Sequence, residues 1–101
     1  MTSIRLKNKE ISIIVNSFIN TFQHGELYLF GSRTDASRRG GDIDLYITPF
    51  SKTELSRKKI DFLVNMKKGL GEQKIDVVID RNYNREIDKI AKDTGVLLCR
   101  N

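Results

Sequence analysis

The sequence predicts one α+β domain, in which a small mixed β-sheet is packed with helices. With 101 residues and 39% apolar content, the chain is long enough for one hydrophobic core. Apolar runs of strand length alternate with segments of helical periodicity, in the order α-β-β-α-β-α-β. We find no repeat, linker or low-complexity segment. Residues 1–101 are therefore treated as a single domain.

The first helix is indicated by apolar residues of Ile11–Phe22 that recur at i, i+3, i+4, i+7 and i+11. They predict a helix from about Lys7 to Thr21. We expect His24 and Gly25 to end it, with the glycine in the left-handed C-terminal position. His24 is interpreted as a helix-end residue and not as a ligand. The first strand is expected at Glu26–Phe30.

The second strand is expected at Ile43–Ile47, and Pro49 is expected to stop the sheet because proline cannot donate to a ladder. Ser51 and Glu54 have the S-x-x-E spacing of a capping box, which predicts the start of a second helix. The apolar positions of that helix are Leu55, Phe62, Leu63, Met66 and Leu70. Its cations are Arg57, Lys58, Lys59, Lys67 and Lys68. We interpret these cations as a solvated face; a docking surface for an acidic partner is the alternative.

The last part of the chain contains two strands around a third helix. Lys74–Ile79 is rich in β-branched residues and predicts the third strand. After a polar turn at Asp80–Asn84, a helix is expected from about Arg85 to Thr94, ended by Gly95. Val96–Cys99 is expected to form a short closing strand.

The composition limits the classes of partner and compartment. The net charge of +5 favours anionic partners, such as nucleotides, nucleic acid or an acidic protein, although a solvated basic surface explains it equally well. The single cysteine, Cys99, excludes an internal disulfide and fits a reducing cytosol. No apolar run approaches the roughly 20 residues that span a bilayer. We therefore expect a cytoplasmic protein without a membrane partner.

The chain is organised around residues 27–47, where two apolar strands flank a polar loop. The loop opens with Gly31-Ser32, and the next strand opens with Asp42 and Asp44. Successive side chains of a strand point to opposite faces, so the two aspartates share one face. Adjacent carboxylates repel each other and lose hydration, which costs stability unless a cation or donor lies between them. We interpret this stretch as a site for metal and phosphate.

A third carboxylate, Asp76, lies in the third apolar strand, where we expect it to be buried. If that strand lies beside the second, Asp76 faces Asp42 and Asp44 at cross-strand distances of about 4.5–5.5 Å. Oxygen ligands without His or Cys favour Mg²⁺ or Mn²⁺. Three carboxylates can hold two such ions about 3.5–4 Å apart for phosphoryl or nucleotidyl transfer. Asp42 and Asp44 would bridge the ions, and Asp76 would complete the one that activates the attacking hydroxyl.

The loop residues offer groups for phosphate. Gly31 lets the backbone approach a phosphate, and Ser32 provides a hydroxyl and a main-chain N–H. Arg33, Arg38 and Arg39 can screen the charge of the developing pyrophosphate. Simple exposure explains Arg38 and Arg39 equally well.

Each feature alone has a simpler explanation. A Gly-Ser pair is an ordinary turn, and a D-x-D is commonly a loop or cap feature. Asp76 alone could pair with Lys74. We therefore base the site on the conjunction of all three features, and we interpret Asp35 and Asp80 as ordinary loop acids.

At these residues the chain resembles the minimal nucleotidyltransferases (MNT) of the DNA polymerase β-like superfamily. Their signature is a strand ending in G-S, a loop, and D-x-D on the next strand. Here Gly31-Ser32 and Asp42-Ile43-Asp44 are separated by nine residues, and Asp76 matches the family's third acid. The resemblance covers nearly the whole chain, and it implies the polymerase β-like nucleotidyltransferase fold.

The resemblance implies a Mg²⁺-dependent nucleotidyltransferase (two ions, Mn²⁺ as a substitute) that transfers AMP from ATP to a partner protein. The catalytic and metal-binding residues would be Asp42, Asp44 and Asp76, and the nucleotide-binding residues Gly31, Ser32 and Arg33. Family members of this size are commonly antitoxins of two-gene toxin–antitoxin modules. The implied partner is a small helical protein, such as a HEPN-type toxin, that is modified on a tyrosine.

The sequence departs from the family pattern in the loop. It is slightly shorter than is common, and Thr34-Asp35-Ala36 replaces the small-basic-glycine sequence that often follows G-S-R. This difference can alter the contacts with phosphate.

There are three alternatives to protein adenylylation. A non-catalytic antitoxin would neutralise its helical partner by contact alone. Transfer to a small molecule is disfavoured because such relatives carry an added helical domain. A nucleic-acid binder is disfavoured because Tyr28 and Tyr46 lie inside predicted strands.

Overall fold

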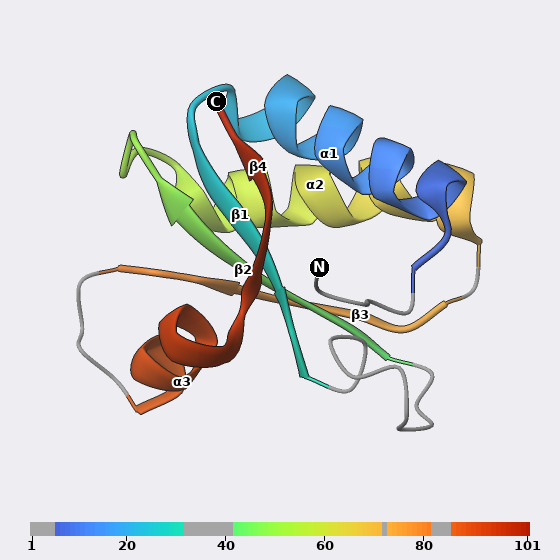
Figure 1. Ribbon diagram of the computed structural model, residues 1–101. Helices are drawn as coiled ribbons and strands as arrows, with labels where there is room; N and C mark the ends of the chain where they lie inside the picture. The colour runs from blue at the N-terminus through green and yellow to red at the C-terminus, as the bar shows by residue number, and fades with distance from the viewer. Residues whose placement is uncertain (1–5, 32–41, 72, 82–85) are drawn as a thin grey trace.

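The computed structural model describes residues 6–31, 42–71, 73–81 and 86–101, apart from the side chains of residues 87 and 90–92. Within these ranges the elements follow the predicted order (Figure 1). They are α1 (Asn8–Phe22), β1 (Gly25–Phe30), β2 (Ile43–Pro49), α2 (Leu55–Leu70), β3 (Ile75–Ile79), α3 (Glu86–Thr94) and β4 (Val96–Arg100). None of the helices described is long and apolar enough to cross a membrane.

The four strands form one mixed sheet in the order β3-β2-β1-β4. β1 pairs antiparallel with both β2 and β4, whereas β2 and β3 are parallel. The predicted α+β class with a small mixed sheet is therefore confirmed. A parallel pair needs a crossover connection, and α2 provides it between β2 and β3. As a result, two acidic strands that are distant in the sequence lie side by side.

α1 and α2 lie together on one face of the sheet and enclose the core (Figure 1). Phe18 and Phe22 of α1 contact Phe62 of α2, with ring centroids 6.4 and 5.7 Å apart. The strand side chains that point to these helices are buried and apolar: Leu27, Leu29, Ile43, Leu45, Ile47, Ile75, Val77 and Ile79. Burial of these side chains is what holds the two helices to the sheet.

α3 lies on the other face of the sheet (Figure 1). Tyr46 alternates with the core residues Leu45 and Ile47, so its side chain points to this second face. Its hydroxyl donates to Asp88 Oδ1 at 3.1 Å, and both residues are buried. This contact links α3 to the middle of β2.

Pro49 ends the second strand, as predicted, although β2 extends beyond the expected end at Ile47. Pro49 is the last residue of β2 and lies opposite Gly25 of β1. The N–H of the next residue, Phe50, donates to the carbonyl of His24 at 3.2 Å. The Gly25–Pro49 pair is therefore a non-hydrogen-bonded position of the ladder, where a missing N–H has no cost.

The second helix begins where it was expected, at Leu55, but the capping box predicted at Ser51 and Glu54 is wrong. Glu54 is itself the residue before α2, with a left-handed backbone (φ 52°) and no capping hydrogen bond from its side chain. Ser51 Oγ instead accepts a hydrogen bond from the N–H of Thr53 at 3.3 Å. Ser51 therefore stabilises a local turn before the helix and does not cap the helix.

The end of α1 differs from the prediction as well. Gln23 is the residue that follows the helix with a positive φ (67°), and its N–H donates to the carbonyl of Ile19 at 3.0 Å. Gly25 also has a positive φ (137°), but it lies in β1. A Cβ there would in addition lie 2.5 Å from the carbonyl oxygen of Thr48. His24 follows the helix and is exposed, as expected of a helix-end residue.

Candidate active site

The parallel register of β2 and β3 sets Asp44 directly opposite Asp76. Their neighbours Leu45 and Val77 are buried in the core, so the two aspartates point to the face that α1 and α2 do not cover. Asp42 precedes β2 and shares this face by alternation. The condition on which Asp76 was placed near the other two acids, that the third strand lies beside the second, is therefore met.

Asp76 is exposed, whereas the sequence led us to expect a buried carboxylate. β3 is an edge strand of the sheet, and the helices of the core, α1 and α2, cover one of its two faces. Ile75 and Val77 are buried on that face, so β3 alternates between buried and open positions. The open position leaves the Asp76 carboxylate exposed to solvent.

The carboxylates act on one another. Partial burial and the charges of Asp76 and Asp42 raise the pKa of the Asp44 carboxyl above its ordinary value, and the charge of Lys74 opposes this shift. Like charges raise a pKa in this way only at short range, so the shift indicates that the carboxylates of Asp42 and Asp76 lie near Asp44. A bound divalent cation would relieve the repulsion.

Lys74 directly precedes β3 and pairs with Asp42, with 3.6 Å between Nζ and Oδ2. The sequence suggested Asp76 as the partner of Lys74. The register explains the difference, because the N–H of Ile43 donates to the carbonyl of Lys74 and so brings the start of β3 beside Asp42. Both side chains are largely exposed, so the ion pair adds little to stability. It does place a cation next to the acids.

Gly31 brings the backbone at the end of β1 against the Asp44 carboxylate. Its φ is +78°, and a Cβ at this position would collide with Asp44 Oδ2. Phe30, the residue before it, lies opposite Asp44 in the β1–β2 ladder. Glycine is therefore required by the backbone angle and by the space left beside the acid.

The remaining sequence candidates lie outside the described residues. They are Ser32, Arg33, Asp35, Arg38 and Arg39. Their roles stay predictions.

Among the described residues, no three His, Cys, Asp or Glu side chains stand together as a complete metal-binding group. Asp42 is held by Lys74 and would have to leave it to join the other two acids. The donor chemistry nevertheless fits Mg²⁺, which commonly takes one or two carboxylates and completes its shell with substrate phosphates and water. Asp44 and Asp76, adjacent across the parallel pair, are suited to supply these carboxylates.

A second acidic cluster, which the sequence did not reveal, lies further along the same face. Asp80 and Asp88 are 6% and 3% exposed, so the interpretation of Asp80 as an ordinary loop acid is wrong. Burial, the hydrogen bond to Asp88 and the charge of Asp80 raise the pKa of Tyr46 well above its ordinary value. The alternation of Asp44 and Tyr46 was readable in the sequence, but the position of α3 over Tyr46 was not.

The fold has counterparts among solved structures, although no protein-family model and no curated protein matches the sequence. It is similar to a chain in the crystal structure of a toxin–antitoxin with AMP-PNP, with a TM-score of 0.73 and 16% identity. That match covers 90% of this chain and 73% of the other.

A second similar chain belongs to the structure of the tri-AMPylated Shewanella oneidensis HEPN toxin in complex with MNT antitoxin. The TM-score is 0.69 and the identity 16%, with 91% of this chain and 71% of the other covered. At this identity the likeness concerns the fold. The resemblance to minimal nucleotidyltransferases is thus confirmed as a likeness of fold to toxin–antitoxin structures, one of which contains an MNT antitoxin.

Proposed function

We propose that this protein is the antitoxin of a two-gene module and that it transfers AMP from ATP to a HEPN-type toxin. The register of β2 against β3 carries the proposal, because it sets Asp44 beside Asp76 on an open face of the sheet. The likeness to toxin–antitoxin structures supports it, since one contains AMP-PNP and another a tri-AMPylated HEPN toxin. A cytoplasmic location is part of the proposal.

Asp42, Asp44 and Asp76 would hold two Mg²⁺ ions, with Mn²⁺ as a substitute. When bound, these ions neutralise phosphate charge and lower the pKa of the attacking hydroxyl. Gly31 keeps side-chain atoms away from Asp44, so that a phosphate can approach the acids and the backbone together. Ser32 and Arg33 follow Gly31 directly in the chain and would bind the nucleotide.

The transfer forms a bond between the acceptor oxygen and the α-phosphorus of ATP. It breaks the bond from that phosphorus to the pyrophosphate, and the acceptor's hydroxyl proton passes to solvent. The resemblance implies a tyrosine hydroxyl as the acceptor. Asp76 lies on an edge strand and is exposed, which suits an acceptor as large as a protein.

The experiment is the intact mass of the neighbouring gene's product after incubation with this protein and Mg²⁺–ATP. We expect one or more added AMP units, lost with Asp44→Asn. Asp93→Asn is the matched control, since Asp93 is an exposed acid on α3 and should leave the transfer intact. A stable complex with no added mass, together with full neutralisation by Asp44→Asn, would replace the proposal with an antitoxin that acts by contact.

A further inference from the structure

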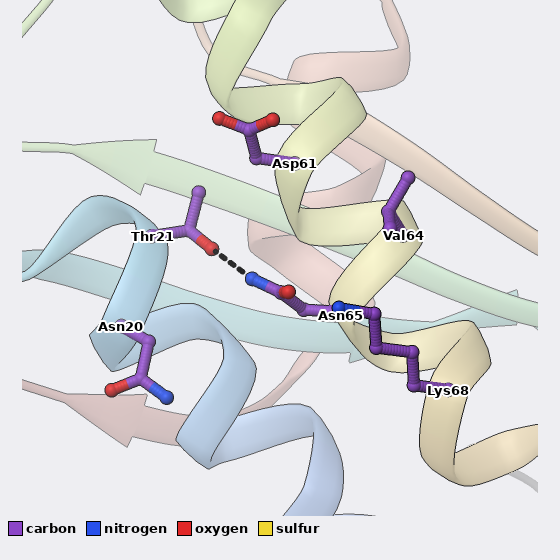
Figure 2. Close-up of a pocket in the computed structure, with 6 residues that line it drawn as sticks. All are labelled: Asn20, Thr21, Asp61, Val64, Asn65 and Lys68. Atoms are coloured by element: carbon purple, nitrogen blue, oxygen red, sulfur yellow. Dashed lines mark hydrogen bonds between the residues drawn. The ribbon is translucent and has the colours of Figure 1, made fainter.

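A groove follows the seam between α1 and α2, on the side of the sheet opposite the candidate site. The helices are antiparallel: Gly69 lies against Ile13, and Asn65 donates to Thr21 Oγ1 at 3.3 Å. A pocket of about 380 Å³ opens along this seam (Figure 2). It is lined by Asn20, Thr21, Asp61, Val64, Asn65 and Lys68.

A second pocket, of about 230 Å³, extends the same groove past the end of α1. Thr21 lines both pockets, so they adjoin. His24, Phe50 and Lys58 line the second one. We call the two pockets together the α1–α2 groove.

Large apolar side chains are exposed along this groove. Phe50 is 82% exposed and Val64 50%, and each lines one of the pockets. Ile60, 62% exposed, lines neither pocket but lies one helical turn before Val64 on α2. The other exposed large apolar residue among those described is Leu97, on edge strand β4. Such clustering is typical of a surface that meets a partner.

The charges on the groove are mainly positive. Lys58 and Lys68 line the pockets, and Lys67 is exposed on α2; none of the three pairs with an acid of the described residues. Asp61 lies 3.9 Å from Arg57 Nε, so its charge is already opposed. An acidic partner would find cations here that lack counter-charges.

The α1 wall of the groove carries uncharged polar groups. Asn20 is exposed and lines the first pocket, as does Thr21, whose hydroxyl accepts a hydrogen bond from Asn65 (Figure 2). Uncharged polar groups cost less to remove from water than charged ones. This wall can therefore be covered by a partner at low cost.

We propose that the α1–α2 groove binds an acidic amphipathic helix of the partner protein. Two antiparallel helices form a groove into which a third helix packs, with its apolar stripe over the exposed apolar residues. The stripe would cover Phe50 and Val64, and flanking acids would meet Lys58 and Lys68. The helix is thereby held away from the carboxylates, which stay open to ATP.

Two other occupants fit the groove less well. A second copy of this chain packed groove against groove would bring Lys58 and Lys68 against the same cations. A nucleic acid would place phosphates beside Asp61, and although bases can stack on Phe50, they would leave aliphatic Val64 without a partner. The observations therefore favour a protein helix.

The inference rests on the proposed function because it assumes the same partner protein. It adds the surface on which that partner binds. The test is isothermal titration calorimetry of the neighbouring gene's product against wild type and Phe50→Ser/Val64→Ser. We expect the double variant to raise the dissociation constant by about tenfold or more. Leu97→Ser is the matched control, since it removes an exposed apolar side chain elsewhere and should bind like wild type.

The charge is tested in the same way. Lys58→Glu/Lys68→Glu should weaken the complex by about tenfold. The wild-type complex should itself become weaker as the salt concentration is raised. Lys89→Glu, on the exposed face of α3, is the control. Groove variants that bind like wild type, an equal loss with Leu97→Ser, or no complex with wild type would each overturn the inference. Binding of RNA or self-association through the groove would overturn it as well.

Failure of the docking inference and failure of the proposed function give different results. If AMP is transferred while the groove variants bind like wild type, the proposed function stands and the docking inference is wrong. If no AMP is transferred while the groove variants lose the complex, the reverse holds. If both are right, the groove variants raise the KM for the partner and leave kcat unchanged.

Discussion

Two acidic clusters lie on one face of the sheet and have opposite surroundings. In the first, Asp44 and Asp76 face each other on an open part of the sheet. In the second, Asp80 and Asp88 are buried, and Asp88 accepts a hydrogen bond from Tyr46. The two clusters differ because α3 covers the second one and leaves the first one open. The second cluster is therefore a structural contact, and the first is the candidate site.

The difference matters because burial changes what a carboxylate can do. A buried carboxylate must be paired or hydrogen-bonded, and its contribution is to hold elements together. A carboxylate at an open sheet edge can exchange water for a metal or phosphate. Substitutions in the two clusters should therefore separate activity from stability.

The largest expected effect is on activity, from Asp44→Asn. The rate of AMP transfer should fall about a thousandfold, because the variant loses one of the carboxylates that would hold the two Mg²⁺ ions. The melting temperature should not fall, since repulsion from Asp42 and Asp76 is relieved. Transfer rates and thermal unfolding of the same preparation check both statements. A variant that transfers AMP at the wild-type rate would contradict the assignment.

Gly31→Ala should have the next largest effect. The added methyl meets the Asp44 carboxylate, so we expect transfer to fall about 10- to 100-fold. Gly71→Ala is an unusually close control: its φ is +77°, against +78° for Gly31, but a Cβ there meets no atom of the described residues within 4 Å. Both variants should lose about 1–2 kcal/mol of stability to backbone strain. Equal activities would show that the contact with Asp44 is unimportant.

Tyr46→Phe should affect stability and leave the chemistry intact. The buried Asp88 loses a hydrogen-bond donor, which costs about 1–3 kcal/mol, or about 4–8 °C of melting temperature for each kcal/mol in a domain of this size. Transfer by the folded fraction should match wild type. Tyr28→Phe is the control, because its hydroxyl donates to Glu26 at a half-buried position and its loss should cost less. Chemical denaturation measures both variants.

The smallest expected effect is the pH dependence of Glu26→Gln. Hydrogen bonds from Tyr28 and Arg100 hold the pKa of Glu26 below its ordinary 4.5. The charged form therefore stabilises the fold above about pH 4.5, and this stability is lost as the pH falls through the lowered pKa of the folded state. At neutral pH the variant should melt slightly below wild type, and the two should converge in acid. A constant difference down to low pH would assign the loss to packing.

The sequence predicted the elements better than their ends. Hydrophobic periodicity placed the helices and strands because the core residues of α1, α2 and the sheet repeat at regular spacing. The capping box at Ser51 and Glu54 was wrong because Glu54 has a left-handed backbone, and β2 extends past Ile47 because its ladder with β1 continues to Pro49. Neither the backbone angle nor the ladder is visible in local sequence.

The sequence predicted the acids of the candidate site but not their environment. Asp42, Asp44 and Asp76 were proposed from spacing, and the β2–β3 register sets Asp44 opposite Asp76, whereas Asp42 pairs with Lys74. The exposure of Asp76 follows from the edge position of β3, and the pairing of Lys74 with Asp42 follows from the register. Strand order and register are properties of the whole sheet, so motif reading could not supply them.

The most direct test is a titration of the ¹⁵N-labelled protein with Mn²⁺ and a non-hydrolysable ATP analogue, followed by NMR. Paramagnetic broadening should centre on the amides of Gly31, Asp44 and Asp76, spare the α3 region around Asp88, and disappear in Asp44→Asn. Broadening centred on Asp80 and Asp88, or none at the open acids, would contradict the claim that the parallel β2–β3 pair builds a divalent-metal and nucleotide site.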